Sequence, residues 1–167
     1  MRVTVLVVGR AGTPFHDAIH EYEERAARYW KLQVIEVSSG AGGKGKGKGK
    51  GKGKASPERV THVEEVKLLN KIPSGAEVVA LTRQGKAMTS TGLARYLEGR
   101  ALASTREVCF VVGGAYGLGP RVMERADRTL SLSSATLPHQ MARLLLAEQV
   151  YRAGTILRNE PYHKGGS

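Results

Sequence analysis

The chain has 167 residues, of which 41% are hydrophobic, enough for one hydrophobic core but too few for two. Its single cysteine, Cys109, excludes an intrachain disulfide and a zinc site with two or more thiolates, and no apolar run is long enough to cross a bilayer. Six of the eleven net positive charges belong to a Gly-Lys repeat, which leaves +5 for the rest. That charge fits an RNA partner, although many proteins that bind no nucleic acid carry as much.

The first elements form a β-α-β unit. Residues 3–8 and 32–37 are rich in β-branched and other apolar residues, as strands are, and Phe15, Ile19, Tyr22, Ala26 and Tyr29 recur between them at helical spacing. No signal-peptide pattern precedes the first strand. We therefore expect one cytoplasmic domain over residues 1–167, with no metal site.

Residues 38–56 contain the Gly-Lys repeat, which has no apolar group to bury and would lose much backbone entropy on ordering. We expect a disordered insertion at residues 40–56. It is either a basic arm that follows an RNA backbone or an insertion tolerated in a surface loop. The second interpretation is favoured, because long loop insertions cost little stability.

Strands and helices continue to alternate after the insertion, which predicts an α/β fold around a mostly parallel sheet. The segment Glu107–Val112 is almost entirely apolar, as strands buried on both faces of a parallel sheet are. The other expected elements are helices over residues 57–71 and 120–127, a helix capped by Thr89 or Ser90, strands over residues 77–82 and 129–133, and a long helix, His139–Leu157.

The long helix carries three consecutive leucines, Leu144, Leu145 and Leu146, which point in different directions. A helix that is apolar most of the way round needs burial on more than one side. In a domain of this size the second side favours a partner subunit, and hence a homodimer. The alternative is a central helix within one protomer.

Three loops follow expected strands, at residues 82–86, 113–119 and 132–139, and such loops meet at one edge of a parallel sheet. The glycine spacing of residues 113–119 is not that of a dinucleotide fingerprint, and Ala87 stands where a P-loop needs Ser or Thr after Gly85 and Lys86. On pattern alone, residues 113–119 are equally well a structural turn.

Four ordered motifs make the pattern more specific. They are Val111-Val112-Gly113-Gly114-Ala115-Tyr116-Gly117, Leu132-Ser133-Ser134-Ala135-Thr136-Leu137-Pro138-His139-Gln140-Met141, Glu148-Gln149-Val150-Tyr151-Arg152-Ala153 and Pro161-Tyr162-His163-Lys164. Together they closely resemble the RlmH family of SPOUT-class methyltransferases, which act on N3 of a pseudouridine in large-subunit (23S) ribosomal RNA. The resemblance covers nearly the whole chain except residues 38–56.

The resemblance implies a SPOUT α/β fold with a C-terminal trefoil knot, a homodimer, and S-adenosylmethionine (S-adenosyl-L-methionine) as the methyl donor. Backbone groups of the strand-end loops would bind the adenine edge, and leucines would cover its ring. The cofactor-binding residues that the resemblance implies are Leu81, Gly113, Leu132, Ser133, Ser134, Ala135, Thr136 and Leu137.

Methyl transfer to N3 requires removal of the imino proton, and the catalytic candidates are His139, Tyr162 and His163, with Glu148 as a further one. For Tyr162 and His163 we favour substrate binding over acid-base catalysis, because in the family the equivalent tail reaches the active site of the dimer. His139 is equally well a capping or packing residue. Candidate phosphate contacts are Arg143, Arg152 and Arg158, although a solvated or ion-paired role at the surface is favoured for each.

Two alternatives remain open at this point. The first keeps the fold and the cofactor but changes the acceptor to another RNA nucleoside. The second is a non-catalytic RNA-binding or ribosome-assembly module that uses the Gly-Lys repeat.

Overall fold

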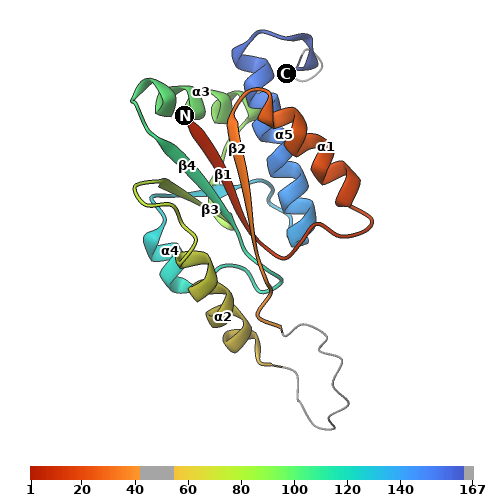
Figure 1. Ribbon diagram of the computed structural model, residues 1–167, viewed down its shortest axis with the longest axis vertical. Helices are drawn as coiled ribbons and strands as arrows, with labels where there is room; N and C mark the ends of the chain where they lie inside the picture. Colours follow the sequence, from red (N-terminus) through yellow and green to blue (C-terminus); the bar gives the residue numbers. More distant parts are fainter. Residues whose placement is uncertain (42–54, 164–167) are drawn as a thin grey trace.

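Five parallel strands form one sheet in the order β2-β1-β4-β3-β5 (Figure 1). The computed structural model describes residues 1–41 and 55–163, so the expected disorder at residues 40–56 falls mostly outside the described residues. The strands are β1 Arg2–Val8, β2 Lys31–Val37, β3 Glu77–Ala87, β4 Glu107–Val112 and β5 Arg128–Ser131. The helices are α1 His16–Ala27, α2 Pro57–Leu69, α3 Ser90–Leu102, α4 Pro120–Arg125 and α5 His139–Leu157, followed by a 3-10 turn, Pro161–His163.

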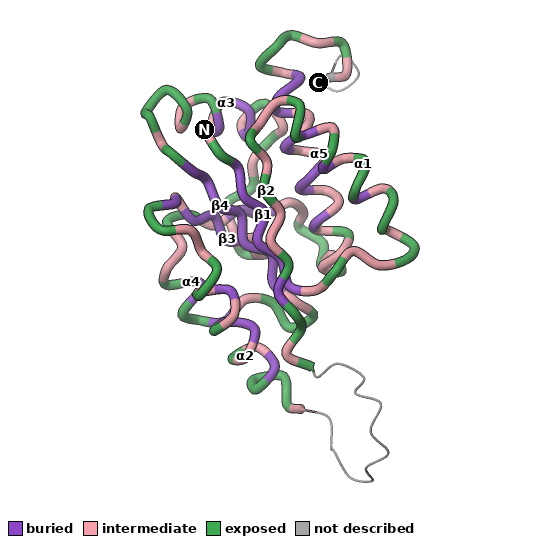
Figure 2. The backbone as a smooth tube through the Cα atoms, in the orientation of Figure 1, coloured by how far each residue is buried: buried purple, intermediate pink, exposed green. Residues whose placement is uncertain are grey.

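Helices cover both faces of the sheet, with α1, α3 and α5 on one face and α2 and α4 on the other (Figure 1). Alternate residues of each strand point to opposite faces. Val5 of β1 therefore packs in the core under α1, α3 and α5, and Leu6 packs in the core under α2 and α4. The strands at the centre of the sheet are buried along most of their length (Figure 2). This three-layer arrangement confirms the predicted α/β class, while the trefoil knot stays a prediction.

Local signals place several helix starts where the sequence predicts them. The Oγ of Ser56 accepts a hydrogen bond from the Arg59 amide at 3.3 Å, and the Oγ1 of Thr89 accepts one from the Gly92 amide at 3.0 Å. Such caps satisfy amide groups that have no partner in the first helical turn. The bounds of β4 and α5 agree with the prediction, whereas α4 and β5 end two residues earlier than expected.

The prediction that residues 82–86 form a loop is partly wrong, because β3 continues through them to Ala87. Leu130 of β5 is paired with both Leu81 and Lys86, so the residues between them bulge out of the ladder. A Cβ on Gly85 would lie 2.6 Å from the carbonyl carbon of Leu130, and only glycine fits there. The bulge shapes the carboxyl end of β3.

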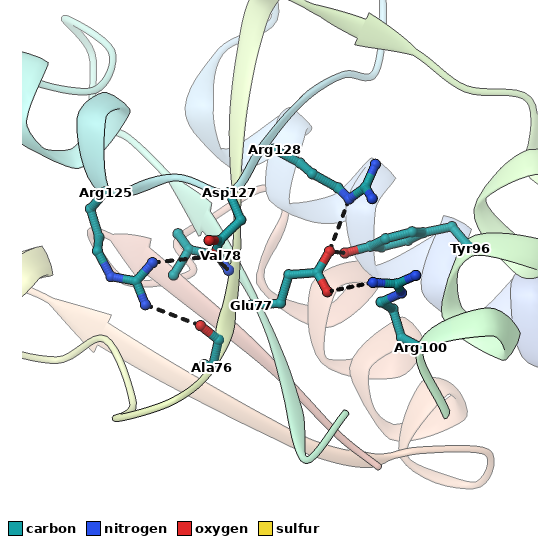
Figure 3. Close-up of polar contacts among 8 residues, drawn as sticks. All are labelled: Ala76, Glu77, Val78, Tyr96, Arg100, Arg125, Asp127 and Arg128. Carbon is teal, nitrogen blue, oxygen red and sulfur yellow. Dashed lines mark hydrogen bonds and ion pairs between the residues drawn. The ribbon is translucent and has the colours of Figure 1, made fainter. Parts of the chain in front are cut away.

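The amino ends of β3 and β5 are joined by a polar cluster (Figure 3). Glu77 accepts hydrogen bonds from Tyr96 at 2.9 Å, from Arg128 at 2.9 Å and from Arg100 at 3.2 Å. Nearby, Asp127 accepts from the Val78 amide at 2.7 Å. These contacts hold α3 and β5 to β3 at the edge of the sheet opposite the strand-end loops.

No helix within residues 1–41 and 55–163 is long and apolar enough to cross a membrane.

Candidate active site

A cleft of about 500 Å³ opens at the carboxyl ends of β3, β4 and β5. In open parallel sheets this edge is where ligands bind. The walls of the cleft are residues 81–84 after β3, residues 112–118 after β4, and residues 130–133 and 135–137 after β5. His139 and Ala142 of α5 complete it. The three strand-end loops therefore converge, as their order in the sequence suggests.

The structure brings the predicted cofactor-binding residues together, with one exception. Ser134 does not line the cleft. The residues that do are Leu81, Gly113, Leu132, Ser133, Ala135, Thr136 and Leu137.

The Gly-rich turn folds back on itself directly behind Gly113. The Gly117 amide donates a hydrogen bond to the Gly114 carbonyl at 3.1 Å. Gly117 has a φ of +80°, a conformation in which residues with a side chain are strained. A Cβ on Gly113 would lie 2.6 Å from the carbonyl carbon of Gly117. Residue 113 must therefore be glycine if the turn is to keep this shape, and its backbone faces the cleft without a side chain.

The loop after β5 is held by its own serines. The Oγ of Ser131 donates to the Ser133 carbonyl at 2.9 Å, and the Oγ of Ser133 accepts from the Ala135 amide at 3.0 Å. Across the cleft, Arg83 donates to the Oγ1 of Thr136 at 3.4 Å and links the bulge of β3 to this loop. The cleft thus combines apolar side chains with polar groups from Arg83, Thr136 and the backbone, which suits a small organic ligand that has both an apolar ring and polar atoms.

His139 is half-buried at the first turn of α5, where it lines the cleft. The loop between β1 and α1 passes close by: a Cβ on Gly9 would lie 3.5 Å from the Nε2 of His139. The same loop is fixed to α5 by Gln140, whose Oε1 accepts from the Gly12 amide at 3.0 Å. Of the predicted catalytic residues whose side chains the structure describes, His139 is the one that lines the cleft of its own chain.

Tyr162 lies elsewhere, in a cluster near the other end of α5. Its hydroxyl donates to Glu148 at 3.1 Å and lies 3.3 Å from the hydroxyl of Tyr22. Arg152 forms an ion pair with Glu148 at 2.6 Å, and its guanidinium lies 4.8 Å from the centre of the Tyr162 ring. Burial, the hydrogen bond with Tyr22 and the charge of Glu148 raise the pKa of Tyr162, so its hydroxyl stays protonated and can donate.

The cleft and this cluster are separated within one chain. Glu148 lies nine residues after His139 in α5, which is roughly 14 Å along a helix axis at about 1.5 Å per residue. The structure does not bring His139 and Tyr162 together in one protomer. His163 ends the 3-10 turn beside Tyr162, and its side chain lies outside the described part of the molecule.

Arg143 forms ion pairs, as the sequence favours over a phosphate contact, but these pairs are buried and not at the surface, because its side chain is only 3% exposed. Its guanidinium donates to Glu23 of α1 at 2.7 Å and to Glu36 of β2 at 2.6 Å. Both carboxylates outweigh the effect of burial and raise the pKa of Arg143, so it stays charged. It therefore anchors α5 one turn beyond His139. Arg158, by contrast, is exposed and stacks on Tyr29 at 4.6 Å from the ring centre.

Two buried residues behind the cleft, Glu64 and Glu65 of α2, were not predicted to matter. A signal for one of them exists: Val60, Glu64 and Leu68 are spaced four residues apart, which places Glu64 on the buried side of α2. Their contacts with the Gly-rich turn depend on residues about fifty positions later, which the helical spacing does not reveal.

A family model described as "Predicted SPOUT methyltransferase" matches residues 1–163. The chain belongs to this family. A relative from Gemmatimonas aurantiaca, named ribosomal RNA large subunit methyltransferase H, is 48% identical over 98% of this chain and 100% of its own length. One from Syntrophotalea carbinolica with the same name is 40% identical over 98% of this chain and 99% of its own length. These matches confirm the resemblance found in the motifs.

A solved structure shares the fold of this chain. A probable methylase family protein from Haemophilus influenzae superposes with a TM-score of 0.52 and covers 99% of this chain and 71% of that protein. At 11% sequence identity the likeness concerns the fold alone.

Proposed function

We propose that this SPOUT methyltransferase transfers a methyl group from S-adenosylmethionine to N3 of a pseudouridine in large-subunit ribosomal RNA, as a cytoplasmic homodimer. The observation that carries the proposal is the cleft built from the loops after β3, β4 and β5. The substrate is inferred from relatives that match over nearly their full length and are named for large-subunit ribosomal RNA.

The cleft has the chemistry that an adenosyl group requires. Leu81, Leu132 and Leu137 offer apolar surface to a planar ring, and Gly113 lines the cleft with its backbone. The bound cofactor supplies an electrophilic methyl group on a positively charged sulfur. The role of the cleft is to hold that methyl group in line with the acceptor nitrogen, and such positioning contributes much of the acceleration in a transfer of this kind.

His139 is the residue of the cleft best placed to hold the acceptor base or to take its imino proton. It lies at the first turn of α5, and the contacts of Gln140 and Arg143 fix that turn against the β1–α1 loop and α1. A group in this position can act by general acid-base catalysis or by orienting the base.

The tail cluster enters the reaction through the dimer. Tyr162 is remote from the cleft of its own chain, so the family pattern requires the tail of a second copy to approach the cleft. A groove of about 500 Å³ beside the cleft shares Leu130 and Leu132 with it and is lined further by Leu93 of α3 and Leu145 of α5. Polar side chains, among them Thr89, Ser90 and Gln149, also line this groove. Exposed Met141 lies one turn before Leu145 on α5, and this mixed surface is where we place the partner.

The acceptor is tested with labelled S-adenosylmethionine and two ribosome preparations, one with the pseudouridine and one in which uridine replaces it. We expect label only in the ribosomes that contain pseudouridine. Equal labelling of both would show that the acceptor is another nucleoside, which is the principal alternative.

The shared site is tested by complementation. Gly113→Val should disable the cleft and Tyr162→Phe the tail cluster, and each variant alone should be inactive. Co-expressed, they should regain about a quarter of the wild-type activity, since about half of the dimers are mixed and each of these has one intact site. No recovery in a preparation shown to contain mixed dimers would exclude a site shared between protomers.

The non-catalytic alternative is tested by deleting residues 43–54, which removes the six lysines of the Gly-Lys repeat. We expect the affinity for S-adenosylhomocysteine to be unchanged, because the described walls of the cleft begin at residue 81. The RNA-binding module predicts instead that RNA affinity collapses when the repeat is deleted. A wild-type protein without measurable affinity for S-adenosylhomocysteine by calorimetry would favour the RNA-binding module.

A further inference from the structure

Two adjacent carboxylates on α2 are buried against the back of the Gly-rich turn. Glu64 and Glu65 are each only 2% exposed, and the reaction proposed above does not use them. Burying a carboxylate is costly unless hydrogen bonds compensate. Their position therefore calls for a reason.

Glu64 is only half satisfied. Its Oε1 accepts one hydrogen bond from the Oγ of Ser39 at 2.9 Å and another from the backbone amide of Gly40 at 2.9 Å. Its Oε2 is fully buried and has no partner among the described residues. This carboxylate lies against Gly114, where an added Cβ would be 2.6 Å from Oε2 and 2.9 Å from Oε1. The space of the missing side chain of Gly114 is filled by Glu64.

Glu65 holds the other end of the same turn. Its Oε1 accepts from the Arg121 amide at 2.6 Å, in the first turn of α4. A Cβ on Gly119 would lie 2.5 Å from the same oxygen, so only glycine allows this approach. Neighbouring residues of one rigid helix thus contact both ends of the turn whose residues 112–118 form a wall of the cleft.

We propose that Glu64 and Glu65 are positioning residues for the cofactor: they fix the turn from behind, and the Oε2 of Glu64 accepts a backbone N–H of the turn when the cofactor is bound. The inference rests on the proposed function, because it assumes that the cleft binds S-adenosylmethionine. A buried charged acceptor gains more from one additional N–H than a neutral acceptor does. The unpaired oxygen therefore favours the shape of the turn that completes this bond.

The main test is Glu64→Gln, in which the amide oxygen can keep the bonds to Ser39 and Gly40 while an NH2 group replaces the free acceptor. Glu124→Gln is the matched control, because it makes the same charge change at an exposed position of α4. Affinity for S-adenosylhomocysteine is measured by calorimetry, Tm by thermal denaturation, and KM and kcat with ribosomes.

For Glu64→Gln we expect the affinity for S-adenosylhomocysteine to be about tenfold weaker, because a tenfold change in affinity corresponds to the loss of about one hydrogen bond to a charged acceptor. The KM for S-adenosylmethionine should rise, kcat should stay within about twofold of wild type, and Tm should not fall. Glu124→Gln should match the wild type throughout. Wild-type affinity in Glu64→Gln, with or without a lower Tm, would overturn the inference. If the wild-type protein itself fails to bind S-adenosylhomocysteine, the proposed function fails as well.

A double-mutant cycle tests the contact directly. Gly114→Ala places a methyl group against the carboxylate and should weaken cofactor binding, whereas adding Glu64→Ala makes room for that methyl group. The double variant should bind S-adenosylhomocysteine more tightly than the sum of the single effects predicts. Additive effects would show that residues 64 and 114 do not act together on the cofactor.

Discussion

The shape of the cleft depends on residue 113 having no side chain. Any Cβ there would press on the backbone of Gly117 and open the turn. We predict that Gly113→Val lowers the affinity for S-adenosylhomocysteine by at least about tenfold while the protein remains folded, because the strain is confined to one turn. Calorimetry measures the affinity and circular dichroism the fold.

Gly99→Ala is the control for Gly113→Val, since an added Cβ on this residue of α3 would meet nothing within 4 Å. It should raise the free energy of unfolding by about 1 kcal/mol, as replacing glycine within a helix usually does. Unchanged cofactor affinity in Gly113→Val would mean that the turn does not shape the site.

Arg143 acts at the scale of elements, because it ties α5 to α1 through Glu23 and to β2 through Glu36. Arg143→Met would leave a buried carboxylate without its partner, which we expect to lower the free energy of unfolding by about 3 kcal/mol. Urea denaturation provides the measurement. Arg95→Met, at an exposed position of α3, should change stability by less than about 0.5 kcal/mol. A loss below about 1 kcal/mol in Arg143→Met would contradict the anchoring role.

Glu77 makes the clamp between β3, α3 and β5 sensitive to acid (Figure 3). Burial raises its pKa, but hydrogen bonds from Tyr96, Arg128 and Arg100 outweigh burial and hold the pKa below the usual value. A depressed carboxyl pKa means that the clamp stabilises the fold above the unfolded-state pKa of about 4.3 and loses this effect as the pH falls through the folded-state value.

Glu77→Gln should therefore cost about 1–2 kcal/mol at pH 7 and progressively less as the pH is lowered below about 4. Thermal denaturation of both proteins across this range measures the difference. A constant difference in stability at all pH values would show that ionisation of Glu77 contributes nothing.

The sequence predicts the bounds of an element correctly where the local signals are strong. The apolar run of β4 and the Pro138-His139 start of α5 need no knowledge of the rest of the chain. The extension of β3 to Ala87 depends instead on pairing with Leu130, more than forty residues later. In the site, too, local motifs predict the loops that form the cleft. The partners of Arg143 and the contacts of Glu64 could not be predicted, because they come from segments far away in the sequence.

For the whole molecule, the proposed homodimer can be tested at one exposed residue of α5. Met141 is 41% exposed on α5 close to the cleft, and its side chain is not needed for the core of one protomer. Met141→Glu should convert the proposed dimer into a folded monomer and abolish methyl transfer, as measured by light scattering and by labelling of ribosomes. Met141→Leu should leave both unchanged. A dimer that survives Met141→Glu would place the interface elsewhere.

The strand order also decides when the chain can begin to fold. Strand β1 lies between β2 and β4, and its partner Glu107–Val112 comes about a hundred residues after it in the chain. Helix α5, which covers one side of the core, comes later still. Pairing of such distant segments gives a high contact order, which slows folding. The β1–α1–β2 unit can pair early, whereas the core under α1, α3 and α5 can close only after α5 has been synthesised.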